Sequence, residues 1–292
     1  MKTIGVLTPS SAVDENVLAG GIAYWKSKGY QVKESAHLYA KNRFLAGSDE
    51  ERAADLAALF RDDEVDVIMA ACGGYGAARM LGKIDYRLIA AHKKPFVGLS
   101  DTTALQLALL EKSGLISFSG YLMKPRHGRE MFPYTEQSLS DCLSGREQVF
   151  SGLESDYDGG EIAGRLVGGC LSLIAGLLGT PYFPDMSGNI LVLEDLSEEP
   201  YVIDRLMTQL ENAGVFEKTA AVIFGVFMDC KAKDPADGTI EDVLNEWKHR
   251  INRPVFSGFP YGHQAGSAVW PVGGRAVLAA GTMRVSGVEF NG

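Results

Sequence analysis

The sequence predicts an α/β protein with a doubly wound parallel sheet in its N-terminal half and a smaller, β-rich α+β domain in its C-terminal half. Three observations lead to this fold class. The chain has 292 residues, a length typical of about two domains. Residues 1–120 alternate regularly between strand and helix patterns. A polar, acidic segment then separates them from a region that mixes hairpins with helices.

The N-terminal half alternates between strands and helices along its whole length. Strands are predicted at residues 3–10, 30–35, 65–71, 95–100 and 115–120, and helices at residues 14–29, 48–63 and 101–114, with a loop that enters a helix at residues 72–81. Asp14 suits the N-cap and Gly29 the end of the first helix. Ser48 and Glu51 have the spacing of a capping box at the start of the second helix. The nearly continuous apolar run at residues 65–71 is typical of a strand buried on both faces of a parallel sheet.

Two loops of this half follow directly after predicted strands. Regular alternation of strands and helices implies right-handed βαβ crossovers, which make neighbouring strands parallel. Ligands bind such sheets outside the carboxyl ends of the strands. The glycine run from Gly73 to Gly76 and the serine Ser100 both lie at strand carboxyl ends. We therefore expect the two loops to face one crevice.

The character of the sequence changes between about residues 140 and 163, where it becomes polar, acidic and glycine-containing. We predict a first domain over residues 1–145, a linker over residues 146–163 and a second domain over residues 164–292. Strands and helices of the second domain are predicted at residues 189–196, 200–214, 220–227 and 239–251. The tail from residue 268 alternates and turns at Gly273–Gly274, which predicts β-hairpins.

Composition and charge exclude several classes of protein. Apolar residues make up 46% and charged residues 22% of the chain, as in ordinary soluble globular proteins. The net charge of −9 argues against a nucleic-acid partner, because nucleic-acid binding needs clustered lysines and arginines. The four cysteines show no C-x-x-C pair, and the apolar run IGVL near the N-terminus is too short for a signal peptide. Reduced thiols and a cytoplasmic location are therefore expected.

Patterns for membranes, metals and cofactors are weak. Residues 166–184 carry no charge, but their glycines and prolines make a poor spanning helix, since about twenty predominantly apolar residues are needed to cross a bilayer. We expect a buried glycine-rich turn and a core helix there, and no membrane partner. The five histidines show no H-x-x-x-H spacing, and the glycine run lacks both common phosphate-binding motifs. No metal and no cofactor are expected.

Ser100 lies where a short apolar strand runs straight into a helix, in the segment FVGLSDTTALQLALLEK. One interpretation is helix capping, in which Ser100 or Asp101 accepts a hydrogen bond from the first N–H groups of the helix. The other is a nucleophile on a tight strand-to-helix turn, at the positive end of the helix dipole. The elbow motif G-x-S-x-G is incomplete because Thr102 replaces its second glycine. The turn alone leaves both interpretations open.

The partners that a nucleophilic serine needs are present elsewhere in the sequence. A serine requires a base, and the base requires an orienting carboxylate. His263 lies in the glycine-flanked loop FPYGHQAG, although a loop histidine without a catalytic role is an equal alternative. Glu194 ends the strand NILVLED, where alternation places it on the same face as Val192, while Asp195 points the other way. An acid on an apolar strand face indicates a specific partner, because burying an unpaired charge is unfavourable.

Five motifs occur in order along essentially the whole chain: CGGYGAARML, VGLSDTTAL, GRLVGGCLSLIAGLLGTPY, LVLEDLSEEPYVIDRLMTQL and FPYGH. Together they resemble the LD-carboxypeptidase family of serine peptidases, which includes muropeptide LD-carboxypeptidases and microcin C self-immunity peptidases. The resemblance implies a catalytic triad of Ser100, His263 and Glu194. It also implies an oxyanion hole of backbone N–H groups, which map to Asp101 and Gly74. The family fold is a flavodoxin-like N-terminal domain joined to a smaller β-rich domain, usually as a homodimer.

The chain departs from the family pattern at three places that border the expected pocket. Cys72 stands where the family has an arginine before the glycine loop. The segment SFSGYL at residues 117–122 replaces a His-Gly-Pro motif, and Cys170 replaces a common asparagine. None of these changes touches the implied triad. They therefore affect the expected substrate rather than the expected reaction.

A carboxypeptidase must also bind the terminal carboxylate of its substrate, and the planar fork of arginine matches two carboxylate oxygens. With a cysteine at the first position of the glycine loop, another basic side chain is needed. The predicted substrate-binding residues are Gly73, Tyr75, Arg79, Arg126 and Arg205. For each arginine, an exposed surface position without a role is the commoner alternative.

The resemblance implies a cytoplasmic serine carboxypeptidase that cuts the amide between an L-centre and a terminal D-amino acid. The expected reaction converts a muropeptide L,D-tetrapeptide into a tripeptide and D-alanine. One alternative is a peptidase of the microcin-immunity type, which would act on peptidyl or aminoacyl nucleotides. An alternative of another class is a non-catalytic two-domain protein that binds a small molecule in the same crevice.

Overall fold

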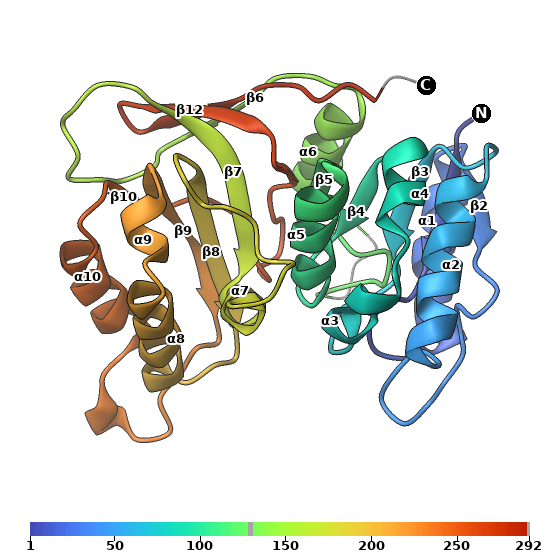
Figure 1. The fold of residues 1–292 in the computed structure, drawn as a ribbon, viewed down its shortest axis with the longest axis horizontal. Coiled ribbons are helices and arrows are strands. Elements are labelled where there is room, and N and C mark those ends of the chain that lie inside the picture. The colour runs from blue at the N-terminus through green and yellow to red at the C-terminus, as the bar shows by residue number, and fades with distance from the viewer. Residues whose placement is uncertain (128–130, 291–292) are drawn as a thin grey trace.

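Two β-sheets organise the chain, each with its own helices (Figure 1). The computed structural model describes residues 1–127 and 131–290. The strands of the first sheet are β1 (Thr3–Leu7), β2 (Gln31–Glu34), β3 (Val67–Ala70), β4 (Phe96–Gly98), β5 (Ser117–Ser119) and β11 (Trp270–Val272), in the order β11-β5-β4-β3-β1-β2. Strands β1 to β5 are parallel and follow the flavodoxin-like order, whereas β11 pairs antiparallel with β5.

The N-terminal half contains the helices that the sequence signals predict and two further ones, at residues 86–91 and 133–143. They are α1 (Glu15–Ser27), α2 (Asp49–Arg61), α3 (Ala77–Met80), the 3₁₀ turn η1 (Leu81–Lys83), α4 (Tyr86–Ala91), α5 (Thr102–Ser113) and α6 (Pro133–Leu143). Asp14 caps α1 by accepting a hydrogen bond from the Asn16 N–H. The capping box of Ser48 and Glu51 is present at the start of α2. The predicted doubly wound sheet is therefore confirmed.

The second sheet is mixed. Its strands are β6 (Gln148–Ser151), β7 (Ile162–Cys170), β8 (Ile190–Leu196), β9 (Ala221–Met228), β10 (Val255–Phe256), β12 (Arg275–Ala279) and β13 (Thr282–Val285), in the order β10-β9-β8-β7-β12-β13-β6. Its helices are α7 (Leu171–Leu177), α8 (Pro200–Asn212), α9 (Val215–Lys218), the 3₁₀ turn η2 (Pro235–Asp237) and α10 (Ile240–Arg250). Strands β7 to β10 are parallel, and β12, β13 and β6 are antiparallel.

Three local expectations are wrong. Gly273–Gly274 does not turn a hairpin, because β11 belongs to the first sheet and β12 to the second; the hairpin joins β12 to β13. The expected linker contains β6, whose backbone groups pair with β13. The expected glycine-rich turn is the end of β7, since Gly168 and Gly169 pair with β8. Within residues 1–127 and 131–290, no helix is long and apolar enough to cross a membrane.

Helix α5 lies between the two sheets and packs against α7, β7 and β11 (Figure 1). Its residues from Thr102 to Leu109 are all buried, which explains why its apolar residues do not form a single stripe. The chain from β10 to β11 crosses from the second sheet back to the first. These two features bring the beginning of α5, the end of β8 and the segment before β11 into one region.

Candidate active site

Ser100 occupies a strained turn between the end of β4 at Gly98 and the start of α5 at Thr102. Its φ is 68°, in the left-handed region that a side chain with a Cβ rarely adopts. Asp101 is the N-cap residue of α5 and makes no side-chain cap hydrogen bond. Among the described residues, the Ser100 hydroxyl also donates and accepts no hydrogen bond. The structure therefore excludes helix capping as the role of either side chain.

The glycine loop at residues 73–76 packs directly against this turn. A Cβ on Gly73 would lie 2.9 Å from the Ser100 Cβ and 3.2 Å from its Oγ, so only glycine allows this approach. The Asp101 carboxylate is buried and accepts a hydrogen bond from the Ala77 N–H at 2.8 Å. Burial raises the pKa of Asp101. The buried guanidinium of Arg52 donates to the Gly76 carbonyl at 2.8 Å and fixes the loop from the other side.

The main-chain N–H groups of Gly74 and Asp101 face no acceptor within the part of the chain that the structure describes. Gly74 has a φ of 104°, and its neighbour Tyr75 donates its own N–H to the Ser11 hydroxyl at 3.0 Å. Asp101 lies at the positive end of α5. Main-chain N–H groups without an acceptor are the donors that an oxyanion hole uses, and these two are the ones that the sequence analysis names.

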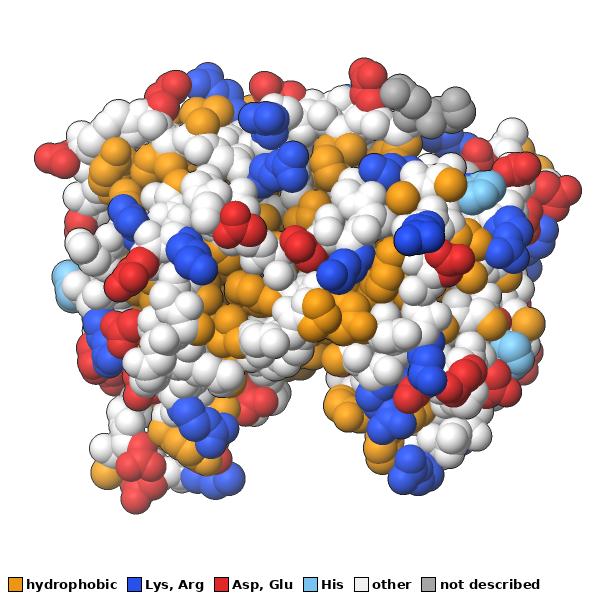
Figure 2. Space-filling model, in the orientation of Figure 1, with side chains coloured by type: hydrophobic (Ala, Val, Ile, Leu, Met, Phe, Trp, Pro, Cys, Tyr) orange, Lys and Arg blue, Asp and Glu red, His pale blue; other side chains and the backbone are white. Residues whose placement is uncertain are grey.

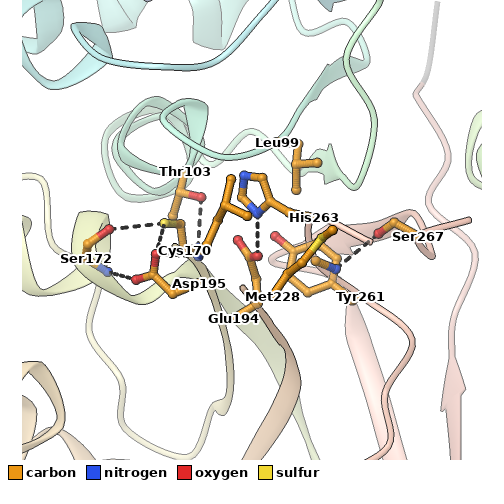
Figure 3. A network of polar contacts seen from close by, with 12 residues as sticks. Leu99, Thr103, Cys170, Ser172, Glu194, Asp195, Met228, Tyr261, His263 and Ser267 are labelled. Atoms are coloured by element: carbon orange, nitrogen blue, oxygen red, sulfur yellow. Dashed lines mark hydrogen bonds and ion pairs between the residues drawn. The ribbon is translucent and has the colours of Figure 1, made fainter. Parts of the chain in front are cut away.

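Glu194 and His263 form a buried pair at the end of β8. The His263 Nδ1 donates to the Glu194 Oε2 at 2.7 Å, and the exposed fractions of the two residues are 0% for Glu194 and 4% for His263 (Figure 3). Because Nδ1 carries this hydrogen, Nε2 is the ring atom left to accept a proton. Gly262 permits the approach: its φ is 142°, and a Cβ there would lie 3.1 Å from Glu194 Oε2. The arrangement is that of a general base with its orienting acid.

Asp195 is also buried but has entirely different partners. Its carboxylate accepts hydrogen bonds from the N–H groups of Ser172 and Leu196, both at 2.8 Å, and its pKa is raised by burial. Figure 3 shows Asp195 directed towards Cys170 and Ser172, and Glu194 towards His263. A register shift in β8 between Leu193 and Asp195 accompanies this divergence. The two neighbouring acids therefore point in opposite directions, as strand alternation predicts, and the extra residue at the register shift lies on β9.

Two contacts bring the serine and the histidine halves together. The Thr103 Oγ1, in the first turn of α5, accepts a hydrogen bond from the Cys170 N–H at 3.1 Å, and Cys170 pairs with Glu194 in the sheet. The hydroxyls of Ser119 and Tyr261 lie 2.8 Å apart and join β5 to the histidine segment. No hydrogen bond links Ser100 to His263 among the described residues, and such bonds often form only once substrate is present.

The molecule has two lobes, one built on each sheet, and its surface is hollowed between them. Figure 2 shows a notch in the lower edge of the molecule, and in Figure 1 α3 and α7 lie beside this edge. Both helices directly follow carboxyl ends of parallel strands, β3 and β7. The carboxyl ends of parallel strands are where α/β sheets bind ligands, and the crevice expected beside Ser100 and the glycine loop stays a prediction.

The predicted substrate-binding residues differ in whether their side chains are already hydrogen-bonded to other protein groups. Arg79 is held by Asp49 through two hydrogen bonds of 3.0 Å, and Arg205 is exposed on α8. Arg126 donates from Nη2 to the His263 carbonyl at 2.8 Å. Tyr75 is exposed, and its ring centroid lies 5.7 Å from that of Phe44.

The cysteines that replace family residues are both buried. The Cys72 thiol donates to the Ser11 carbonyl at 3.0 Å, and burial raises its pKa to about 11. Burial likewise raises the pKa of Cys170, whose Sγ lies 3.4 Å from the Asp195 Oδ1. Neither thiol is therefore a ready nucleophile at neutral pH.

Two basic residues of the site were not predicted from the sequence. Lys124 is exposed, acts electrostatically on Cys72 and lines a cavity together with Arg126 and Ser267. His127 lies with its Nε2 at 2.8 Å from the His263 carbonyl. A sequence signal for both residues exists: the basic run KPRH at residues 124–127 follows the carboxyl end of a predicted strand, where ligands bind such sheets. Within the described residues, no three histidine, cysteine or acidic side chains cluster as metal ligands do.

A serine on a strand-to-helix elbow and a buried acid–histidine pair, shared between two α/β domains, are typical of hydrolytic enzymes. Models of the LD-carboxypeptidase N-terminal and C-terminal domains match residues 4–120 and 163–278. The chain belongs to the LD-carboxypeptidase family.

Relatives of known name match almost the whole chain. The probable murein peptide carboxypeptidase of Bacillus subtilis is 36% identical over 281 residues, which cover 94% of this chain and 88% of that protein. The Microcin C7 self-immunity protein MccF of Escherichia coli is 26% identical, with 98% of this chain and 93% of that protein covered. The crystal structure of muramoyltetrapeptide carboxypeptidase from Oxalobacter formigenes superposes with a TM-score of 0.89, at 30% identity and 99% coverage of both chains.

Proposed function

We propose that this protein is a serine carboxypeptidase that hydrolyses the amide between an L-centre and a terminal D-amino acid. Its substrate would be a muropeptide L,D-tetrapeptide, and its products a tripeptide and D-alanine. The observation that carries the proposal is the buried 2.7 Å contact between His263 and Glu194 in the same region as the strained Ser100. The likeness to murein peptide carboxypeptidases supports the choice of substrate.

In the proposed mechanism, the Ser100 Oγ attacks the scissile carbonyl while His263 Nε2 takes its proton. Glu194 holds the imidazole in the required tautomer and stabilises the imidazolium. The N–H groups of Asp101 and Gly74 bind the oxyanion, and one such donor is worth about 2.7–4 kcal/mol of transition-state stabilisation. His263 then protonates the leaving amine of the D-amino acid. Water, activated by the same imidazole, hydrolyses the ester on Ser100 and restores the enzyme.

Recognition of the terminal carboxylate is assigned to Lys124. Its amine is exposed beside the glycine loop and forms no ion pair among the described residues. Arg79 is engaged by Asp49, and Arg126 by the His263 carbonyl. Lysine binds a carboxylate as a compact point charge rather than as a fork.

The substrate assignment is tested by product analysis on matched peptides. Purified protein is incubated with an L,D-tetrapeptide, a D,D-pentapeptide and an all-L tetrapeptide, and the products are identified by mass spectrometry. We expect D-alanine from the L,D-tetrapeptide alone, because the wrong stereochemistry misplaces the carbonyl and a 1 Å error lowers the rate about 10²-fold. An intact L,D-tetrapeptide after prolonged incubation would refute the assignment.

Cleavage of peptidyl or aminoacyl nucleotides is the second candidate function. The likeness to MccF across 98% of this chain favours it. Adding an aminoacyl sulfamoyl nucleoside to the same panel separates the two: cleavage of the nucleoside conjugate with the tetrapeptide left intact would select this function. A protein that only binds its ligand would release no product from any member of the panel. A homodimeric state and a cytoplasmic location stay predictions, which light scattering and cell fractionation would measure.

A further inference from the structure

The carbonyl of His263 is held by two side chains from the opposite lobe. The Arg126 Nη2 and the His127 Nε2 each lie 2.8 Å from this oxygen. A carbonyl oxygen has two lone pairs, so the two donors saturate it. Both donors come from the segment after β5, which is more than 130 residues away in sequence.

The backbone of the segment that carries the two donors, Arg126 and His127, has an unusual conformation. His127 has a φ of 51°, which in a non-glycine residue persists only where the surroundings enforce it. Its ring makes an edge contact with Phe132, with the centroids 6.2 Å apart. Arg126 is half-buried, and burial lowers its pKa. The hydrogen bond from this charged, partly desolvated guanidinium to the His263 carbonyl is charge-assisted and therefore stronger than one between neutral groups.

The rest of the histidine loop is anchored separately. The Gly262 N–H donates to the Ser267 Oγ at 3.1 Å, and the Thr135 hydroxyl of α6 donates to the Ser267 carbonyl at 2.8 Å. These bonds hold the distal end of the loop. The end that carries His263 is held by Glu194 through the ring and by the two donors through the backbone.

We infer that Arg126 and His127 are positioning residues for the general base: their two hydrogen bonds fix the His263 backbone and thereby the place of the imidazole that contacts Glu194. The inference rests on the proposed function, in which His263 is the base. It assigns Arg126 a role other than binding substrate, and it assigns His127 its first role.

The test is the phosphonylation of Ser100 by a fluorophosphonate probe, with the saturated rate constant and the half-saturating probe concentration determined separately. Arg126→Met removes the donor, Arg126→Lys keeps one donor, and His127→Phe keeps the ring but removes the donor. Arg146→Met is the matched control, because Arg146 is exposed and pairs with Asp141 on α6.

Arg126→Met and His127→Phe should each lower the saturated rate constant by about 10- to 100-fold, as expected for a displaced base, with little change in the half-saturating concentration. Arg126→Lys should recover part of the loss because it keeps a donor, and the control should match the wild type. A merely structural role would lower the fraction of protein that reacts without changing the rate constant of the fraction that does.

Unchanged saturated rate constants in both Arg126→Met and His127→Phe would overturn the inference while the proposed function stands. If Arg126→Met fails to fold, the contrast between Arg126→Lys and His127→Phe decides in its place. Failure of the wild type itself to react would instead refute the proposed function.

The inference then still has a readout that needs no reaction, which is the mobility of the His263 ring followed by NMR. The ring should be more mobile in Arg126→Met than in the wild type, because the His263 carbonyl loses one of its two donors. Equal ring mobility in the two proteins would contradict the positioning role.

Discussion

The two lobes contribute to the site in different ways. The first lobe provides backbone: a serine at φ 68°, a glycine loop pressed against it, and N–H groups without acceptors among the described residues. The second lobe provides side chains: the acid Glu194, with an exposed fraction of 0%, hydrogen-bonded to a histidine that is almost as deeply buried. The first half is open to a substrate, and the second is enclosed by protein.

Because of this difference, mutations in the two lobes should affect catalytic activity and folding stability to different degrees. A change to the serine removes a side chain that makes no hydrogen bond in the described structure, and the fold loses little. A change to Glu194 or His263 leaves a buried partner unsatisfied, which costs about 1–3 kcal/mol in addition to any loss of activity. Mutations in the two halves should therefore have different combinations of kinetic and thermodynamic effects.

The largest expected effect is that of Ser100→Ala. Turnover of the L,D-tetrapeptide should fall by roughly 10⁶-fold, because triad residues act as a unit. The free energy of unfolding should change by about 0.5 kcal/mol or less. Steady-state kinetics and urea unfolding measure the two quantities. Retained turnover, or a large loss of stability, would contradict the claim that Ser100 contributes to catalysis but little to folding.

Glu194→Gln should lower kcat by about 10⁴-fold with little change in KM, since the imidazole loses its orienting acceptor. It should also destabilise the fold by about 1–3 kcal/mol, because Glu194 is fully buried. Asp195→Asn is the matched control: its carboxylate is similarly buried but bonded to Ser172 and Leu196. A greater kinetic loss in Asp195→Asn would mean that the wrong acid has been assigned.

Lys124→Met tests whether the first lobe binds the terminal carboxylate of the substrate. If its amine binds the terminal carboxylate, KM for the tetrapeptide should rise about 10- to 100-fold, the loss expected for a charge-assisted hydrogen bond of about 1.5–3 kcal/mol. Stability should be unchanged because the side chain is exposed. The exposed Lys26 on α1 provides the control variant Lys26→Met. Equal KM values for the two variants would rule out this carboxylate site.

The smallest expected effect concerns Asp101 and pH. Burial raises the pKa of Asp101 in the folded protein above its value in the unfolded chain. The unfolded state therefore releases this proton first, and folding stability falls as pH rises from about 4 through the raised folded value. Asp101→Asn removes this titration while its amide oxygen can still accept from the Ala77 N–H. Urea unfolding at several pH values should show a smaller decline in the variant, and identical pH profiles would contradict the shift.

The parts of the structure that local patterns predict are those in which neighbouring residues decide the outcome. Alternation and capping signals were sufficient for β1 to β5 and for the starts of α1 and α2. The return of β11 to the first sheet and the pairing of β6 with β13 depend on distant partners, and local patterns carry no record of them. The site divides in the same way. Ser100 lies on a local elbow, whereas the role of His127 arises from a contact with His263.

The most direct test of the account is to map the residue that a fluorophosphonate probe modifies in the wild-type protein. After reaction, the protein is digested and the adduct is located by tandem mass spectrometry. The account predicts one adduct, on Ser100, whose rate of formation falls by several orders of magnitude in Glu194→Gln but not in Asp195→Asn. An adduct on another residue, or no adduct at all, would contradict the proposal that Ser100, His263 and Glu194 act together.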